Sequence, residues 1–360
     1  QDGDPFFYDT AYNLRTKYKD PEPKDYLKDF GKEAHDHFYA TLHSEFRAFT
    51  EAVKAGDYDH LIDIPSLVRY FMVNDLIGNL EFGHPKSTYL HRSDIFDAST
   101  RWTFGPVWDC DWAYGYEHSG EFGIASPEFD VFQVAPAGHG RALFKQLLQS
   151  SEEVRRQYYL LWNDFVNNGG LDALTHAIEG YITPGAWELS DALCLRSIQM
   201  IAANLRAAAD GDADAVEQMG LAAYINGMAY SNVGLGLVHG MAHPLGGRYN
   251  APHGVANGIL LAPVMAFNAE HTGEKYRDIA EAFGVEGART MPLEEARAAA
   301  VEAVAQLTRD LGNPTRISEV GVEADGVEAL TDDAFADVCT PGNPRPATRE
   351  DIKALYTSLL

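Results

Sequence analysis

Four side chains in the second half of the sequence are suited to hold a divalent transition metal: Asp172, His176, His239 and His253. The segment GGLDALTHAIEGYIT places Asp172 and His176 four residues apart, so in a helix they lie on one face, one turn apart. His239 opens HGMAH, and His253 follows in NAPHGVANG. One carboxylate and three neutral imidazoles leave a divalent ion with a net charge of about +1 and room for an oxygen ligand, which is typical of an open Lewis-acid site.

A single histidine on an apolar helix face is more often a hydrogen-bonded core residue than a metal ligand. Two features of this sequence favour the ligand interpretation: the i,i+4 spacing of Asp172 and His176, and the small residues around His239. These small residues are Gly234, Gly236, Gly240, Ala242, Gly246 and Gly247. The residues alone leave the choice between iron and zinc open.

The run from Gly169 to the C-terminus resembles the helical metal-binding domain of the iron-containing alcohol dehydrogenases. The similarity lies in separated blocks: GGLDALTHAIEGYITPGAWELSDAL, GMAYSNVGLGLVHGMAHPLGGRYNAPHGVANGILL, TGEKYRDIAEAFGV and VCTPGNPRPATREDIKALY. By this resemblance the iron ligands are Asp172, His176, His239 and His253. His243, one helical turn beyond His239, would face the substrate and the nicotinamide. The resemblance implies NAD-dependent interconversion of a small alcohol and aldehyde, with Fe²⁺ polarising the substrate oxygen and Zn²⁺ as the alternative ion.

The first half departs from that family. There, a dinucleotide-binding domain precedes the helical domain, and a Gly-Gly-Gly-Ser turn holds the pyrophosphate at a helix N-terminus. This chain has no such turn and no G-x-G-x-x-G after a hydrophobic strand. The family resemblance implies NAD, but the sequence predicts that turnover is weak or absent.

Residues 20–167 instead resemble the C-terminal part of the CotH-type spore-coat kinases, mainly through RYFMVNDLIGNLEFGHPKSTYLHRSDIFDASTRWTFGPVWDCDWAYGYE. By this resemblance Asp109 and Asp111 hold a magnesium-nucleotide, and Asn79 and Glu81 belong to the catalytic-loop region. Closely spaced carboxylates suit Mg²⁺ that bridges phosphates, so this half predicts Mg-ATP as the alternative cofactor. The competing interpretation is that Asp109 and Asp111 are solvated residues at a strand end.

Aromatic composition divides the chain: 31 of the 41 aromatic residues precede Gly169, and the remainder is rich in alanine and glycine. We therefore expect a two-part chain, with an α+β kinase-like fragment at 1–168 followed by an all-α dehydrogenase-like domain at 169–360. The run Asn167-Asn168-Gly169-Gly170 predicts a turn and a helix end at the join. A fused chain in which neither activity survives is a third alternative.

Charge and hydropathy set further bounds. The chain carries 28 Lys and Arg against 53 Asp and Glu, a net charge of −25, which argues against a nucleic-acid partner. No apolar run reaches the length of a membrane span, and the three cysteines are too scattered for a disulfide framework. We expect a cytoplasmic protein that acts on a small aldehyde or alcohol, although a kinase-like half would fit a spore-coat or secreted protein. The oligomeric state stays open.

Periodicity predicts helices through the second half and a mixture of elements in the first. Thr331 and Thr348 have the pattern of helix N-caps. In the first half we expect helices near 31–54, 65–79 and 139–166 and strands near 86–91 and 101–107. In the second half we expect helices near 171–183, 188–208, 213–231, 234–245, 253–268, 273–283, 293–311 and 348–358.

Overall fold

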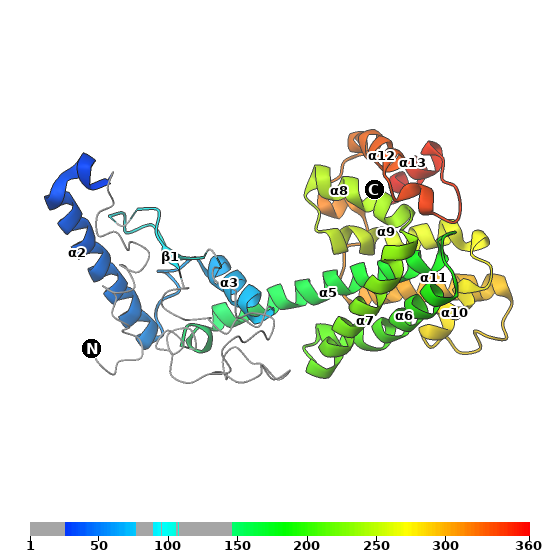
Figure 1. The fold of residues 1–360 in the computed structure, drawn as a ribbon, viewed down its shortest axis with the longest axis horizontal. Coiled ribbons are helices and arrows are strands. Elements are labelled where there is room, and N and C mark those ends of the chain that lie inside the picture. The colour runs from blue at the N-terminus through cyan, green and yellow to red at the C-terminus, as the bar shows by residue number, and fades with distance from the viewer. Residues whose placement is uncertain (1–25, 77–88, 95, 106, 108–145) are drawn as a thin grey trace. The chain divides into compact units, whose positions relative to one another are not determined.

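The computed structural model describes residues 26–76, 89–94, 96–105, 107 and 146–360. The chain divides into two compact units, Gln1–Trp162 and Asn163–Leu360. The boundary falls inside helix α5 (Glu152–Ile182). Figure 1 shows the elements of each unit.

Before residues 146–150 and the start of α5, which are also helical, the described part of the first unit contains two helices and a short ladder. These elements are α2 (Tyr26–Ala55), α3 (Ile64–Leu76), β1 (Leu90–His91) and β2 (Thr103–Phe104). The two strands are antiparallel, with Leu90 opposite Phe104. Both helices and both strands occur where periodicity predicts them, but each strand is only two residues long. The kinase-like fold of this unit stays a prediction.

The core of the first unit is built from large aromatic side chains. Phe49, Phe71 and Trp102 are almost fully buried. The Trp102 ring contacts Phe46 edge-on, with 5.8 Å between the ring centroids. Arg92 covers the same indole, with its guanidinium carbon 5.7 Å from the ring centroid. These wide, rigid rings pack together with aliphatic side chains such as Val53, Ile62 and Leu67.

The second unit is helical throughout, as the sequence predicts, with no strand among its described residues. After α5 follow α6 (Glu188–Ala209), α7 (Ala213–Val233), α8 (Leu237–Tyr249), α9 (His253–Asn268), α10 (Lys275–Ala282), α11 (Leu293–Asp310), α12 (Val327–Ala336) and α13 (Arg349–Ser358). Short 3₁₀ turns η1 (Ala269–His271), η2 (Ile317–Val320), η3 (Ala324–Gly326) and η4 (Thr340–Gly342) connect them. Helix α8 packs against both α9 and α12 (Figure 1).

The predicted turn at Asn167-Asn168-Gly169-Gly170 is wrong, because α5 continues through all four residues. The reason is tertiary packing. A Cβ atom on Gly170 would lie 2.2 Å from a Leu205 methyl carbon on α6, so a larger residue here would force the Leu205 side chain to move. Gly169 has open space around it. A glycine inside a helix costs about 1 kcal/mol relative to alanine, and packing of this kind can offset that cost.

Of the two predicted N-caps, one is confirmed and one is wrong. Thr348 caps α13, where its hydroxyl accepts from the Asp351 backbone N–H and the Asp351 carboxylate accepts in return. Thr331 lies inside α12 and donates its hydroxyl to the Val327 carbonyl at 2.7 Å. The acidic residue three positions on, which completes a capping box, distinguishes Thr348.

None of the helices among the described residues has the length and hydropathy required to cross a lipid bilayer.

Candidate metal centre

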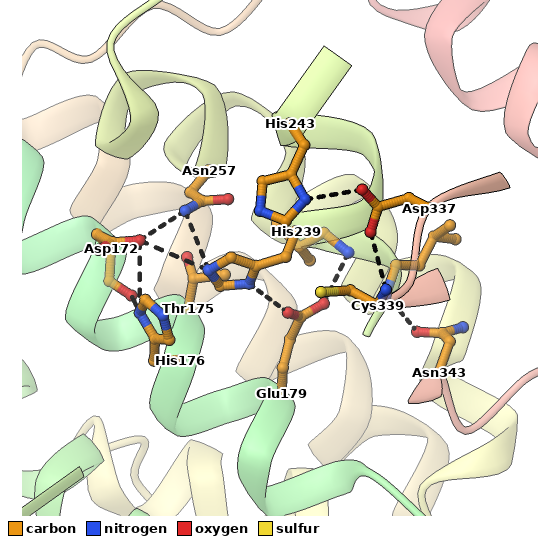
Figure 2. Close-up of polar contacts among 12 residues, drawn as sticks. Asp172, Thr175, His176, Glu179, His239, His243, Asn257, Asp337, Cys339 and Asn343 are labelled. Carbon is orange, nitrogen blue, oxygen red and sulfur yellow. Dashed lines mark hydrogen bonds and ion pairs between the residues drawn. The ribbon is translucent and has the colours of Figure 1, made fainter. Parts of the chain in front are cut away.

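Three helices bring Asp172, His176, His239 and His253 to one place in the second unit. Asp172 and His176 lie one turn apart on α5, His239 lies in the first turn of α8, and His253 begins α9. Figure 2 shows Asp172, His176 and His239 directed toward one another. Ligand atoms of these three residues lie within 4.8 Å of one another. The i,i+4 spacing therefore places Asp172 and His176 on one face of α5, as the sequence predicts. Tertiary packing brings His239 and His253 to the same place.

The separations of these atoms fit a shared cation. The Nε2 atoms of His253 and His239 lie 3.3 and 3.6 Å from Asp172 Oδ1. Two ligands bound about 2.0–2.3 Å from one ion lie about 2.8–3.8 Å apart at octahedral or tetrahedral angles. These oxygen and nitrogen donors suit Fe²⁺ or Zn²⁺. The residues present therefore fit the metal that the family resemblance implies.

Glu179 fixes the orientation of His239. This glutamate is almost completely buried on α5 and accepts from His239 Nδ1 at 2.6 Å, while its other oxygen accepts the Val238 backbone N–H at 2.6 Å. A proton held on Nδ1 leaves the Nε2 lone pair directed at Asp172. The carboxylate also sits at the N-terminus of α8, where unpaired amides favour an anion.

Electrostatics at this centre favour a positive charge. Burial alone would lower the pKa of His239, but hydrogen bonds to Asp172 and Glu179 outweigh burial and raise this pKa to about 9. Burial would raise the pKa of Asp172, but His239 and His253 hold it well below its usual range. The two carboxylates thus favour a positive charge beside them, which a bound cation would supply.

His176 presents a second oriented imidazole. Its Nδ1 lies 2.8 Å from the backbone oxygen of Asp172, and its ring contacts Tyr230 at a tilt of 36°, with 4.2 Å between centroids. When Nδ1–H donates to this carbonyl, Nε2 is unprotonated and its lone pair is available to a metal ion. Burial lowers the pKa of His176, which keeps the imidazole in the neutral form that binds metals.

Asn257 lies among the proposed ligands, one helical turn beyond His253. Its Nδ2 donates to Asp172 Oδ1 at 2.7 Å and lies 3.2 Å from His253 Nε2 and 3.5 Å from His239 Nε2. Its Oδ1 is buried without a hydrogen-bond partner among the described residues. The Asn257 amide nitrogen thus lies close to one nitrogen or oxygen atom of each of three proposed ligands.

His243 lies beside this cluster on α8. Its ring is stacked against that of His253, with 5.6 Å between centroids and 11° between planes, and it is 5.9 Å from His239. Its Nδ1 lies 2.8 Å from Asp337 Oδ2, and its side chain is 41% exposed. The expectation that His243 faces the substrate and the nicotinamide, and its catalytic role, stay predictions.

The kinase-like candidates Asn79, Glu81, Asp109 and Asp111 lie outside the described residues. Their roles therefore stay predictions.

Sequence reasoning missed four polar residues that surround the metal cluster: Glu179, Asn257, Asp337 and Cys339. Two of them carried a signal in the sequence. Glu179 lies seven residues after Asp172 on the same helix face, and Asn257 lies four residues after His253. Asp337 and Cys339 reach His243 only through tertiary packing, so no local spacing predicts them.

The fold and this cluster define a C-terminal domain of the iron-containing alcohol dehydrogenase class. The model for "Fe-containing alcohol dehydrogenase family, C-terminal" matches residues 166–360, so the chain belongs to that family through this domain. A model for "CotH kinase protein" matches residues 3–183, and the two matches overlap at 166–183, which includes the last part of α5. Both family resemblances read from the sequence are thereby confirmed.

Curated relatives match this chain over its helical half. Lactaldehyde reductase of Escherichia coli strain K12 is 62% identical over 187 residues, covering 52% of this chain and 49% of that protein. The 1,3-propanediol dehydrogenase of Citrobacter freundii is 39% identical over 191 residues, covering 52% of this chain and 49% of the relative. The chain spans about half the length of the curated relatives it matches.

Solved structures of alcohol dehydrogenases are also similar to about half of this chain. A 1,3-propanediol oxidoreductase superposes with a TM-score of 0.53 at 37% identity, covering 54% of this chain and 51% of that one. The alcohol dehydrogenase from Oenococcus oeni gives a TM-score of 0.54 at 29% identity, covering 56% and 53%. The helical unit is thus similar in both sequence and fold to alcohol dehydrogenases.

Proposed function

We propose that the helical unit binds Fe²⁺ through Asp172, His176, His239 and His253 and belongs to an NAD-linked oxidoreductase of small alcohols and aldehydes. The observation that carries the proposal is the approach of two imidazole Nε2 atoms to one Asp172 oxygen, at 3.3 and 3.6 Å. When bound, the ion supplies Lewis-acid polarisation of the substrate oxygen. Zn²⁺ is the alternative occupant, because it ranks above Fe²⁺ in the divalent affinity series.

The chain's own residues would hold and orient the reactants. Glu179 holds His239 in one tautomer, and Asp337 holds His243 at the exposed side of the cluster. With Nδ1 occupied by Asp337, the Nε2 of His243 is free to bind a hydroxyl or carbonyl group of the substrate. The names of the relatives support small substrates, since they include lactaldehyde, methanol and 1,3-propanediol.

Metal analysis of the purified chain tests the ligand assignment. Wild type should bind iron or zinc, and His239→Ala should bind it more than about 100-fold more weakly, because even residues that only orient ligands contribute 10–100-fold. His271→Ala, which removes an exposed histidine on η1, should leave binding unchanged. Unchanged metal content in His239→Ala would contradict the assignment.

The proposed activity has a separate test. We expect lactaldehyde reduction by NADH to be weak, because nicotinamide positioning accounts for about 7–11 kcal/mol of such barriers and this sequence contains no recognisable pyrophosphate turn. The first 168 residues also carry a net charge of −11, which opposes an anionic cofactor. Robust turnover that His253→Ala abolishes would show that the first half binds the dinucleotide by another route.

Two alternatives stay open as proposals. The CotH kinase match at residues 3–183 favours a kinase-like module for residues 1–168, which Mg-ATP titration would detect. A chain that binds metal in residues 169–360, but neither reduces lactaldehyde nor binds Mg-ATP, would be a fused chain in which neither activity survives. A cytoplasmic location remains a prediction.

A further inference from the structure

A second group of metal-ligating side chains lies beside the proposed iron centre. It consists of His243 on α8, Asp337 directly after α12 and Cys339 directly before η4. One donor atom from each lies within 4.8 Å of the others. The Asp337 carboxylate joins the three, because one oxygen bonds His243 Nδ1 at 2.8 Å and the other accepts the Cys339 backbone N–H at 2.8 Å. Figure 2 shows this arrangement.

We propose that His243, Asp337 and Cys339 form a second metal site, selective for a thiophilic divalent cation such as Zn²⁺. The donor set is one nitrogen, one oxygen and one sulfur, whereas the centre at Asp172 contains no sulfur. Soft thiolate ligands select zinc over harder ions, and three protein ligands leave a fourth position for solvent. Ligands of tetrahedral zinc lie about 3.3–3.6 Å apart, so the cluster reaches this geometry by small side-chain rotations.

Access and charge both support the site. The His243 side chain is 41% exposed and Asp337 is 15% exposed, so a hydrated cation reaches the cluster from solvent. The Asp337 carboxylate bonds both other residues and supplies a negative charge that would attract a divalent cation. On binding, the Cys339 thiol would release its proton to solvent.

A simpler interpretation competes with the metal site. Asp337 orients His243 by a hydrogen bond, and Cys339 is a small packed side chain with no ligand role. The two interpretations differ in one observable property, which is direct bonding between Cys339 sulfur and the ion. The existence of the second site does not depend on the proposed function; only an effect on catalysis, through His243, rests on it.

Cobalt titration distinguishes the interpretations, since a thiolate bound to Co²⁺ gives a near-ultraviolet charge-transfer band and oxygen or nitrogen ligands do not. We expect wild type to bind two equivalents of Co²⁺, with the band developing during one of them. Cys339→Ser should bind one equivalent without the band. The matched control is Cys194→Ser, which changes a buried thiol elsewhere in the unit and should keep both equivalents and the band.

Further variants separate this proposal from the iron assignment. His239→Ala should lose the first equivalent and keep the band, whereas Asp337→Asn should weaken the band and keep the first equivalent. Circular dichroism verifies that each variant is folded. One equivalent without a band in wild type, or a band that survives in Cys339→Ser, would overturn the second site. A wild type that binds only one equivalent of Co²⁺, and develops the band with it, would support the second site. That result would instead count against the metal assignment at Asp172 in the proposed function.

Discussion

The two units of the chain differ in the residues that make their close contacts. In the described part of the first unit, wide rings such as Phe49, Phe71 and Trp102 fill the core. In the second unit, glycines lie where helices approach closely: a Cβ on Gly170 would meet Leu205 at 2.2 Å, and one on Gly254 would meet the Asn168 carbonyl at 2.0 Å. The distance between helix axes depends on the side chains at the contact. Small residues let helices approach closely, so that short polar side chains can meet. The four proposed metal ligands lie in the unit packed this way.

The largest effect that tests this comparison is expected in the aromatic unit. Trp102 is 4% exposed, and Trp102→Ala should destabilise its unit by about 3–5 kcal/mol, because it leaves a large cavity. Metal binding at Asp172 should be retained. Denaturant unfolding followed by circular dichroism, together with metal analysis, measures both quantities. If Trp102→Ala lost as much metal as His239→Ala, the metal ligands of the second unit would depend on the core of the first. The two units could then not be treated as separately packed.

A smaller effect should follow from Glu179→Gln in the helical unit. The glutamine keeps the size of the side chain but removes the charge that orients His239, so metal affinity should fall about 10–100-fold. The control is Glu302→Gln, which changes a 70% exposed carboxylate that pairs with Arg309 and should leave affinity unchanged. Competition against a chromophoric chelator gives both affinities. Equal affinity in the two variants would mean that Glu179 does not orient the ligand.

The smallest effects come from a matched pair of adjacent glycines in α5. Gly170→Ala should destabilise the helical unit by about 1–3 kcal/mol through overpacking against Leu205. Gly169→Ala meets no atom within 4 Å and should stabilise the unit by about 0.5–1 kcal/mol, because alanine favours a helix. Thermal unfolding should therefore shift in opposite directions. Shifts in the same direction would show that close approach at Gly170 is unimportant.

Sequence reasoning was most successful where the signal is local. The i,i+4 spacing of Asp172 and His176 predicts that they share a helix face, and Thr348 with Asp351 predicts a cap; both features are present in the structure. The all-helical character of the second half follows from periodicity in the same way. The ligand roles of the four residues stay a prediction.

The same local reasoning failed where tertiary contacts decide the outcome. Asn-Asn-Gly-Gly is a turn signal on its own, but the contact of Gly170 with Leu205 comes from another helix, so no window of sequence contains it. Asp337 and Cys339 illustrate the same limit for the site, because the fold brings them to His243 from distant segments. Glu179 was within reach of helical periodicity, but its partner Val238 was not.

The arrangement of the proposed ligands on α5, α8 and α9 has a consequence for folding. A cation bound there would join α5 to the consecutive helices α8 and α9, which lie far from α5 in the sequence, and would act as a reversible cross-link. Because the unfolded chain cannot assemble such a site, binding adds to the free energy of unfolding by mass action, about 2.7 kcal/mol when the free ion is at one hundred times its dissociation constant. The melting temperature of the helical unit would then rise with the concentration of the free ion.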